Sequence, residues 1–343
     1  MNYTKNETKA IQQVSAKIAK STFGYWCCDG VNLFSIHGDY KLSVPCAGCG
    51  CWSISRDVFN NVVKASKELS IEYNQENNIL SINGFKVAPN EYEKEKDENI
   101  VESTETQINK SFFDINHDAK ELLNAVDFVS KDYTRYNLNG VCINSGLWAT
   151  DGHKAIITND PIPPKAKSEI IIPAEFVKMF GKLPAKFKAS KDNTQILCEV
   201  INVKIITNAI EGPYPNIRAV IPTIFEHNFY INYKDYKKLD AFLEKAKKLV
   251  KRTKKFAFIP CENYIKLNAV DIDTGVEINE TLENSYFQGE NPCNIGFDAS
   301  YAQMILKKIS KDNEDGFKIE YNTAVSATLW NRNYLLMPTR LAD

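Results

Sequence analysis

Residues 169–180 read EIIIPAEFVKMF, in which a run of branched apolar residues leads directly into a helical pattern. Two other stretches follow the same plan, WSISRDVFNNVV at residues 52–63 and NIGFDASYAQMI at residues 294–305. Ser55 and Asp298 suit the N-cap of the second element, and Pro173 suits a helix start. Each stretch therefore predicts a strand that leads into a helix with an aromatic residue in its first turn.

The same plan extends on both sides of these stretches. In each third of the chain a helical pattern and short strand-like runs come before the stretch, and further strand-like runs come after it. Residues 91–106 are strongly acidic, as in a solvated connector, and a second break falls near Pro222. An internal repeat of this kind predicts three α+β domains of one fold, at residues 1–103, 104–223 and 224–343.

The composition is that of a globular protein. The chain has 343 residues, with 42 Lys and Arg against 43 Asp and Glu and with 43% hydrophobic residues, which excludes a disordered tail and a disulfide-stapled miniprotein. No apolar run reaches the ~18 residues of a membrane span, and the polar, Lys-bearing start is not typical of a signal peptide. We therefore expect a cytoplasmic protein without a membrane partner, whose nine cysteines are mostly reduced thiols.

Six helical patterns each set basic residues opposite an apolar stripe. Over residues 234–255 the stripe comprises Tyr236, Leu239, Phe242, Leu243, Ala246, Leu249 and Val250. The second helix is expected to bury Val58, Phe59, Val62 and Val63 and to expose Arg56, Lys64 and Lys67. A single Lys-rich face is usually solvated surface. Six such faces in a chain of net charge −1 gather positive charge on the helices, and such a surface binds phosphates without reading bases.

The basic residues of these faces, together with Arg135, are the candidates for DNA binding. Their long-range attraction, acting mostly through water, would hold a phosphate backbone without fixing a register. They are Lys5, Lys9, Lys20, Arg56, Lys64, Lys67, Lys120, Lys131, Arg135, Lys178, Lys182, Lys237, Lys245, Lys248, Arg252, Lys307 and Lys308.

Several motifs occur in a fixed order in the second and third repeats. RYNLNGVCINSGLWATDGHKA at residues 135–155 is followed by IIIPAEFVKMF, then by IEGPYPNIRAVIP at residues 210–222, and YLLMPTRL stands at residues 334–341. In this order they resemble the bacterial-type DNA sliding clamp, the beta subunit of the replicative DNA polymerase III. The first repeat carries none of these motifs and is the divergent one.

The resemblance implies the DNA clamp fold, with three clamp-type domains whose helices line a ring interior and whose antiparallel sheets lie outside. It also implies a head-to-tail homodimer that encircles double-stranded DNA as a polymerase processivity factor, with no catalytic residue and no cofactor. The repeats themselves leave unpaired strand edges at the two ends of the chain, and closure across chains would remove them.

The resemblance further implies a pocket that takes short linear peptides from DNA polymerase, the clamp loader and repair proteins. Carried over to this chain, it comprises Leu138, Thr150, Gly152, His153, Lys154, Pro215, Val220, Leu335, Leu336, Met337, Pro338, Arg340 and Leu341. Ala219, Thr339 and the Ala342–Asp343 extension depart from the family pattern. Met, Leu and Pro gathered at a chain end suit an adaptable apolar surface, although a packed terminal strand would have the same composition.

Three alternatives remain open at this point. Cys27, Cys28, Cys46, Cys49 and Cys51 cluster in the first repeat, and the spacing of Cys46 and Cys49 is one that zinc sites use, which would fit a cysteine-metal nucleic-acid enzyme. Buried reduced thiols are the simpler interpretation. The divergent first repeat would also fit a clamp paralogue that binds partner peptides as a regulator or decoy without encircling DNA. His153 beside Asp151 is better explained by an Asp-Gly hairpin turn than by catalysis.

Overall fold

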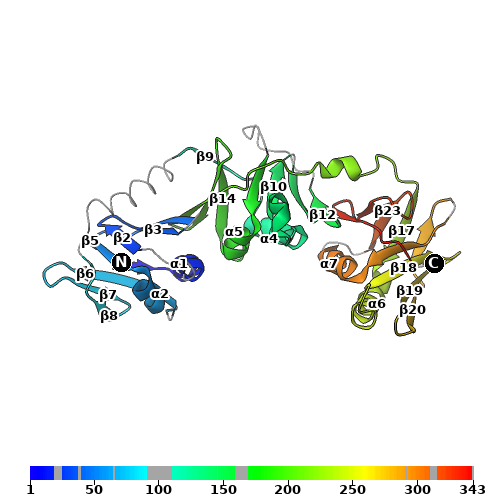
Figure 1. Cartoon of the computed structure of the whole chain (residues 1–343), viewed down its shortest axis with the longest axis horizontal. Helices are drawn as coiled ribbons and strands as arrows, with labels where there is room; N and C mark the ends of the chain where they lie inside the picture. Colours follow the sequence, from blue (N-terminus) through cyan, green and yellow to red (C-terminus); the bar gives the residue numbers. More distant parts are fainter. Residues whose placement is uncertain are drawn as a thin grey trace. The chain divides into compact units, whose positions relative to one another are not determined.

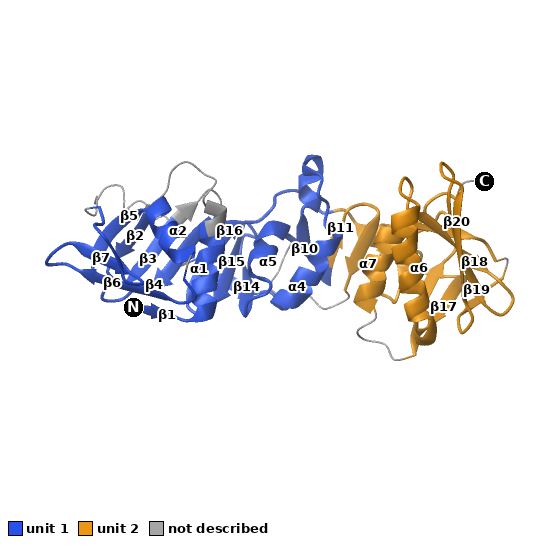
Figure 2. Ribbon diagram, turned by 90° about the horizontal axis from the view of Figure 1, so that it is seen from below, with its two compact units in different colours: residues 1–147, 159–214 blue, residues 148–158, 215–343 orange. Residues whose placement is uncertain are grey.

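The computed structural model describes residues 1–18, 25–37, 40–64, 66–90, 110–144, 146–158, 169–290, 292–309 and 315–341 (Figure 1). The chain divides into two compact units (Figure 2). Unit 1 comprises residues 1–147 and 159–214, and unit 2 comprises residues 148–158 and 215–343. The connector predicted at residues 91–106 lies outside the described residues.

Unit 1 is built on an eight-stranded sheet in which neighbouring strands are antiparallel. Its order is β5 (Cys51–Ser55), β2 (Tyr25–Asp29), β3 (Asn32–His37), β4 (Tyr40–Pro45), β16 (Val203–Asn208), β15 (Gln195–Val200), β14 (Ala185–Ser190) and β9 (Phe112–Asp114). The first and middle repeats meet where β4 pairs with β16, with Leu42 opposite Ile205. This shared sheet explains why two repeats form one compact unit.

Four helices of unit 1 form a continuous row. They are α2 (Arg56–Lys64), α1 (Lys5–Ile18), α5 (Ala174–Phe180) and α4 (Ala119–Ala125), and each contacts the next in this order. Ile11 of α1 and Phe176 of α5 are fully buried. Asp118 and Glu121 form a capping box that starts α4, which η1 (Val126–Phe128) follows.

A four-stranded sheet of unit 1 has the order β1 (Asn2–Tyr3), β6 (Leu69–Asn74), β7 (Ile79–Ile82) and β8 (Phe85–Val87). In the same unit β10 (Gly140–Asn144) pairs with β13 (Ile170–Pro173), and these two strands begin a nine-stranded sheet. Gly140 comes from the LNG motif, and a Cβ there would lie 2.6 Å from the carbonyl oxygen of Ile172, so this strand pair requires glycine. The turn η2 (Tyr133–Leu138) precedes β10.

Among its described residues, unit 2 has strands of two sheets and two α-helices. The first sheet contains β11 (Gly146–Thr150, of which residues 148–150 belong to this unit), β12 (Lys154–Ile157), β25 (Tyr334–Leu336), β24 (Thr328–Trp330), β23 (Gly316–Tyr321), β17 (His227–Asn232) and β21 (Tyr286–Gln288). The second has the order β20 (Val276–Leu282), β19 (Ile265–Asp271), β18 (Lys255–Pro260) and β22 (Ile295–Asp298).

The helices α6 (Tyr236–Leu249) and α7 (Ala299–Ile309) pack side by side in unit 2 (Figure 1). An aromatic core lies between the two sheets. The ring centroids of Phe258 and Phe297 are 5.9 Å apart, and those of Phe297 and Trp330 are 5.4 Å apart. The short turns η3 (Ile217–Val220) and η4 (Tyr233–Asp235) complete the unit. In the described part of the chain no helix is long and apolar enough to cross a membrane.

The three predicted strand-to-helix junctions are confirmed. They are β5 into α2, β13 into α5 and β22 into α7. At the third junction Asp298 Oδ1 accepts hydrogen bonds from the backbone N of Ser300 at 2.7 Å and of Tyr301 at 3.1 Å, as an N-cap should. The α+β class predicted from this repeated unit is therefore the observed one.

The predicted faces of the second helix are wrong at two positions, and Val62, which was expected to be buried, is half-buried. Arg56 is buried, with 4% exposure, whereas Val58 is 40% exposed. The buried positions of α2 are Arg56, Phe59, Asn60 and Val63, which follow helical spacing but include two polar residues. At Asn60 the reason is the neighbouring helix, because Asn60 Nδ2 donates to the carbonyl of Ser15 in α1 at 3.1 Å. A polar contact between helices replaces the purely apolar stripe that hydrophobicity predicted.

The apolar stripe of α6 is observed with one exception. Leu239, Phe242, Leu243 and Ala246 are buried. Leu249 is 43% exposed, contrary to the prediction, because α6 ends at this residue and the chain turns so that Val250 is buried instead.

Candidate nucleic-acid and peptide interfaces

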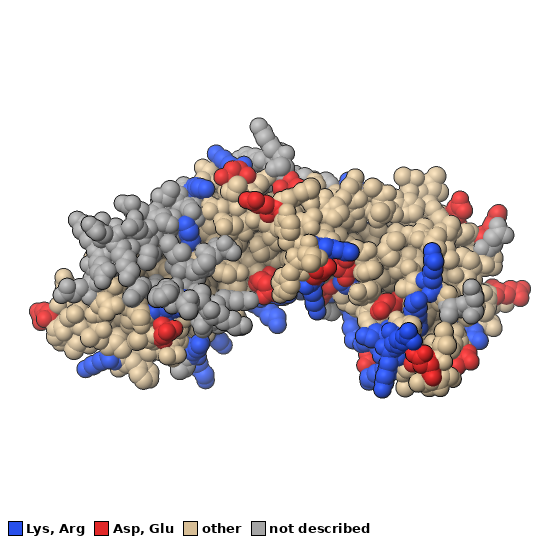
Figure 3. Space-filling view, viewed as in Figure 1, with Lys and Arg blue, Asp and Glu red and all other residues tan. Residues whose placement is uncertain are grey.

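The basic residues of α6 lie at its surface. Lys237, Lys245 and Lys248 are exposed, and Figure 3 shows basic side chains gathered over this helix with acidic ones among them. Glu244 lies 3.1 Å from Lys248 Nζ and 3.2 Å from Lys247 Nζ, and these hydrogen bonds lower the pKa of its carboxyl to about 2. Positive charge therefore exceeds negative charge along this face.

The other predicted DNA-binding residues of unit 2 are also accessible. Lys307 is exposed and Lys308 is half-buried in the last turn of α7. Arg252 is exposed just after α6, where its Nη1 lies 3.2 Å from a carboxylate oxygen of Asp273.

In unit 1 most predicted DNA-binding residues are exposed. The exposed ones are Lys5, Lys9, Lys64, Lys67, Lys120, Lys131, Arg135, Lys178 and Lys182. Lys178 is paired with Glu175 at 2.9 Å on the same helix. Arg56 is buried and does not belong to this surface, and Lys20 lies outside the described residues.

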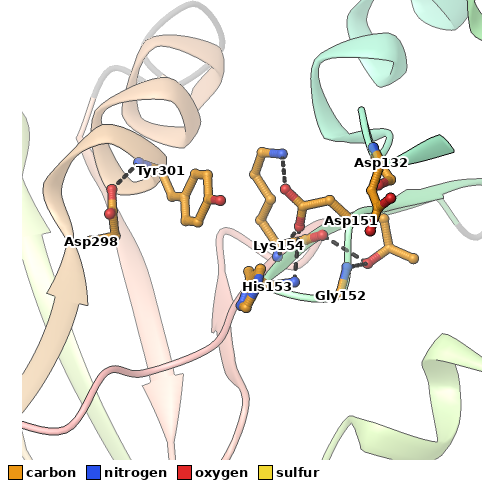
Figure 4. Close-up of polar contacts among 9 residues, drawn as sticks. Asp132, Asp151, Gly152, His153, Lys154, Asp298 and Tyr301 are labelled. Atoms are coloured by element: carbon orange, nitrogen blue, oxygen red, sulfur yellow. Dashed lines mark hydrogen bonds and ion pairs between the residues drawn. The ribbon is translucent and has the colours of Figure 1, made fainter. Parts of the chain in front are cut away.

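The ATDGH motif forms the hairpin turn between β11 and β12 (Figure 4). Thr150 Oγ1 donates to the carbonyl of Lys154 at 2.9 Å and accepts from the backbone N of Gly152 at 3.0 Å. Asp151 Oδ1 accepts from the backbone N of His153 at 2.9 Å and of Lys154 at 3.0 Å. Gly152 has a φ of 91°, which favours glycine. The predicted Asp-Gly turn is therefore confirmed, with Thr150 and Asp151 in structural roles.

Lys154 fixes this turn against α7. Its side chain is 7% exposed, and Nζ lies 2.5 Å from Asp151 Oδ2 and 5.0 Å from the centroid of the Tyr301 ring (Figure 4). The His153 ring stacks on the same tyrosine, with centroids 6.2 Å apart. Burial, followed by the negative charges of Asp151 and Asp298, raises the pKa of Tyr301. The ion pair between Lys154 and Asp151, and the contacts of Lys154 and His153 with the Tyr301 ring, hold the exposed His153 side chain in place.

Tyr301 was not among the predicted site residues. The sequence nevertheless marks this residue, because Tyr301 is the aromatic residue in the first turn of the helix that follows Asp298. Only the folded structure shows that this ring lies against the turn that precedes β12.

The C-terminal tail continues from a paired strand into a partly exposed segment. β25 pairs with β12, with Leu335 opposite Ala155, and Leu335 and Leu336 are buried. Met337 N then donates to the carbonyl of His153 at 2.8 Å. The tail is anchored again where Thr339 N donates to the carbonyl of Gly296 at 2.8 Å.

The C-terminal tail thus contains both a packed strand and residues that are accessible at the surface. The terminal-strand interpretation holds for Leu335 and Leu336. Met337, Pro338 and Leu341 are half-buried and Arg340 is exposed, so these residues have side-chain surface for a partner. Ala342 and Asp343 lie outside the described residues.

The turn η3 adds exposed residues in unit 2. Pro215, Ala219 and Val220 are exposed, Val220 to 54%. Arg218, from the same turn, lies with its guanidinium carbon 5.4 Å from the centroid of the Trp148 ring. Leu138, the remaining predicted pocket residue, is buried in unit 1.

The clustered cysteines behave as buried thiols. Cys27, Cys28, Cys46 and Cys49 are buried, and Cys51 is exposed. A hydrogen bond with Cys28, together with burial, raises the pKa of Cys46 to about 12, so this thiol is protonated at neutral pH. Within the described ranges, no group of three or more His, Cys, Asp or Glu side chains is arranged to hold a metal ion.

Curated proteins similar to this chain are called beta sliding clamps. The chain is 26% identical over 204 residues to that of Rickettsia bellii, an alignment that covers 54% of this chain and 53% of that protein. It is 25% identical over 244 residues to that of Chlamydia muridarum, covering 65% of this chain and 63% of that protein. The chain therefore spans about half the length of the first of these relatives. No family profile matches it.

Solved structures similar to this one extend over the whole chain. The DNA polymerase III subunit beta of Pseudomonas aeruginosa has a TM-score of 0.74 at 16% identity, and that of Borrelia burgdorferi has 0.73 at 18%, each covering 99% of both chains. Structural similarity at 16% and 18% sequence identity establishes the fold of this chain. The order of the LNG, ATDGH and MPTRL motifs, the curated relatives and the fold agree: this chain has the fold of the bacterial sliding clamps, the family that its motifs resemble.

Proposed function

We propose that this chain is a DNA polymerase processivity factor. Two copies close head to tail into a ring that encircles duplex DNA without sequence specificity, and each copy contributes three domains, at residues 1–103, 104–223 and 224–343. The ring stays on DNA through topology and makes or breaks no bond. Polymerase, clamp loader and repair proteins attach to it through short linear peptides, which keeps the polymerase at a high effective concentration near the primer end.

The observation that carries the proposal is the exposure of basic residues on helices of both units. Lysines on α1, α2, α4, α5, α6 and α7 are accessible, although the chain as a whole has a net charge of −1. Flexible lysines of this kind attract phosphates and carry no base-reading geometry. That combination suits a protein that must slide along DNA.

Open strand edges support the closure of a ring. β8 is an outer strand of the four-stranded sheet in unit 1, and Phe85 on it is 59% exposed. β20 is an outer strand of the four-stranded sheet in unit 2. Open edges tend to pair, and head-to-tail pairing of the first domain with the third domain of another copy would cover both.

The peptide-binding part of the proposal rests on unit 2. The hairpin turn Thr150 to Lys154 is held rigidly by its own side chains and by Tyr301, and Met337 is bonded to that turn through the backbone. Half-buried Met337, Pro338 and Leu341 lie on the tail that follows. A partly apolar, adaptable surface on a rigid base suits the capture of apolar peptide side chains.

Retention on DNA of different topology tests the proposal. Protein loaded on nicked circular DNA should remain bound during gel filtration and should leave when the circle is linearised, because only encirclement makes loss depend on free ends. Sedimentation should give twice the 38.9 kDa of one chain. A monomer at tens of micromolar that still binds partner peptides would instead favour the regulator that does not encircle DNA.

A further inference from the structure

Three buried cysteines of the first repeat form a cluster that has no part in the proposed function. The Cys46 thiol forms hydrogen bonds with the thiols of both Cys28 and Cys49. Cys28 and Cys46 are fully buried, and Cys49 is 2% exposed. Neighbouring thiols are the reactants of disulfide formation, so this cluster is a candidate redox site.

Cys46 and Cys49 stand at the two ends of a tight turn. The backbone N of Cys49 donates to the carbonyl of Cys46 at 3.4 Å. Gly48 has a φ of 78°, the left-handed conformation that the third position of a type II turn requires. The Cα atoms at the ends of such a turn lie within about 7 Å, and a disulfide typically spans about 4.4 to 6.8 Å between Cα atoms. A bond between these two sulfurs therefore requires only a local adjustment of the turn.

The N-terminal strand β1 covers this turn. Tyr3 is 4% exposed, and its hydroxyl forms a hydrogen bond with the Cys46 thiol. The Cys49 thiol donates to the carbonyl of Ile71 on β6 at 3.6 Å, and the amino group of Met1 donates to the same carbonyl at 2.6 Å. β1 has two residues and is an outer strand of its sheet, so we expect it to open more readily than the central strands.

The thiols differ in reactivity between the closed and the open state of β1. In the closed state, hydrogen bonds within the cluster, together with burial, raise the pKa of both Cys46 and Cys49, that of Cys46 to about 12. When β1 opens, both thiols meet water and their pKa returns toward the ordinary value of about 8.5. A few per cent of each is then thiolate at neutral pH, and the thiolate is the form that attacks a disulfide.

We propose that Cys46 and Cys49 form a redox site for low-molecular-weight disulfides, gated by the opening of β1. The thiolate of one cysteine attacks a sulfur of the small disulfide and releases a small thiolate. The thiolate of the other cysteine then attacks the mixed disulfide, which forms the bond between Cys46 and Cys49 and releases a second small thiolate. Two protein thiols are oxidised, one small disulfide is reduced to two thiols, and the two cysteine protons pass to the leaving thiolates.

Oxidation should in turn weaken the closure of β1. The disulfide has no S–H group, so Cys49 can no longer donate to the carbonyl of Ile71. The amide of Ile71 donates to the carbonyl of Met1 at 2.8 Å and therefore reports whether β1 is in place. Its hydrogen exchange should be faster in the oxidised protein than in the reduced one.

Incubation of the full chain with glutathione disulfide tests the redox site. After the remaining thiols are blocked with N-ethylmaleimide, peptide mapping should show a bond between Cys46 and Cys49, and dithiothreitol should reverse it. Cys51→Ser, which removes the exposed neighbouring thiol, should form the same bond at about the rate of the parent. A bond that joins Cys49 to Cys51, or Cys28 to Cys46, as the main product would overturn the assignment. So would a parent in which Cys51 reacts while Cys46 and Cys49 stay reduced.

Tyr3→Ala tests the gate, because it removes the ring that covers the turn. Oxidation should be about tenfold faster than in the parent, or more, since loss of a buried ring favours the open state. Tyr3→Phe keeps the ring and loses only the hydroxyl, so it should accelerate oxidation less. Phe128→Ala is the matched control for general destabilisation, because it removes a buried ring from η1 in the middle repeat, and it should oxidise at about the parent's rate.

Thermal melting establishes that each variant is folded. Equal acceleration in Tyr3→Ala and Phe128→Ala would mean that oxidation follows general unfolding and not the opening of β1. Oxidation of Tyr3→Ala at the parent's rate would also contradict the gate. The exchange of the Ile71 amide is measured on the parent alone, so it decides the link between oxidation and β1 even if a variant fails to fold. Equal exchange in the oxidised and reduced parent would contradict that link.

Discussion

Asn202 donates a hydrogen bond of 3.0 Å from Nδ2 to Oε1 of Glu7, a residue 195 positions earlier in the chain. Glu7 is 5% exposed and also accepts from the backbone N of Thr4 at 2.8 Å and from Thr4 Oγ1 at 2.7 Å. One carboxylate thus caps the start of α1 and ties it to the turn between β15 and β16. The first and middle repeats are joined through this side chain as well as through their shared sheet.

Replacing Glu7 by Ala should lower the free energy of unfolding of unit 1 by about 1 to 3 kcal/mol, because donors on Thr4 and Asn202 lose their acceptor in a partly buried place. Asn202→Ala removes only one of these bonds and should cost about 0.5 to 1.5 kcal/mol. Urea denaturation followed by circular dichroism measures both. Lys9→Ala, an exposed change on the same helix, should stay within about 0.5 kcal/mol of the parent. A Glu7→Ala variant as stable as Lys9→Ala would contradict the role of Glu7.

Reversing charge on α6 should weaken DNA association. Lys237, Lys245 and Lys248 are exposed and lie opposite the buried stripe of the helix, so their joint replacement by Glu should leave the fold intact. The variant should bind duplex DNA more weakly, and the dependence of its binding on salt should be flatter, because fewer counterions are released. Binding titrations at several salt concentrations measure this change.

The matched control for charge reversal uses strand lysines. Lys186, Lys204 and Lys318 are exposed on β14, β16 and β23, and replacing them by Glu changes the net charge by the same amount. Under the proposed function this control should keep most of the DNA affinity. Equal losses in both triple variants would mean that overall charge, and not the helix surface, governs binding.

The tail residues Met337 and Leu341 should carry much of the affinity for partner peptides. Their double replacement by Ala should weaken a Gln-Leu-x-Leu-Phe peptide more than tenfold, since hot-spot truncations cost about 2 kcal/mol or more. Retention on nicked circular DNA should persist. As a control, Ile272→Ala with Val325→Ala removes comparable apolar surface at exposed positions of unit 2. If the tail variant binds the peptide as well as this control does, partner binding lies elsewhere.

Asp192 should make stability depend on pH at the acidic end of the range. Hydrogen bonds from Ser190 and Thr194 lower the pKa of its carboxyl to about 2, below its ordinary value of 3.8. A carboxyl with a depressed pKa contributes stability above its unfolded pKa and loses it as the pH falls through the folded value. The stability difference between the parent and Asp192→Ala should therefore be constant above about pH 5 and shrink toward pH 2.

Urea midpoints at pH 7, 4, 3 and 2 for both proteins measure the contribution of Asp192. Lys191→Ala serves as the control, because lysine stays charged over this range and its difference from the parent should not follow the same trend. A difference between the parent and Asp192→Ala that is unchanged at pH 2 would contradict the role of this carboxylate.

Local features of the chain were predictable from sequence. A strand that runs into a capped helix is determined by neighbouring residues, so the junctions at Ser55, Pro173 and Asp298 could be recognised three times. The turn at Asp151 and Gly152 is local for the same reason, since its hydrogen bonds connect residues within four positions. The motif order then sufficed to identify the family whose fold the chain has.

Contacts between distant segments could not be predicted in the same way. Asn60 is buried because its amide donates to a backbone carbonyl of α1, which no hydrophobic pattern within α2 reveals. Tyr301 joins the candidate peptide surface through Lys154, a residue on another element. From sequence alone Asn60 looks like a surface residue and Tyr301 looks like an ordinary core residue.

The pairing of β4 with β16 has a consequence for the order of folding. These strands come from different repeats, and Ser43 pairs with Lys204 across a long stretch of intervening chain. Closing such a distance is slow compared with forming a local hairpin, so β4 keeps an open edge until the middle repeat has been synthesised and folded. Hydrogen exchange should then show the amides of β4 and β16 opening together, as one cooperative block that the strands of unit 2 do not share.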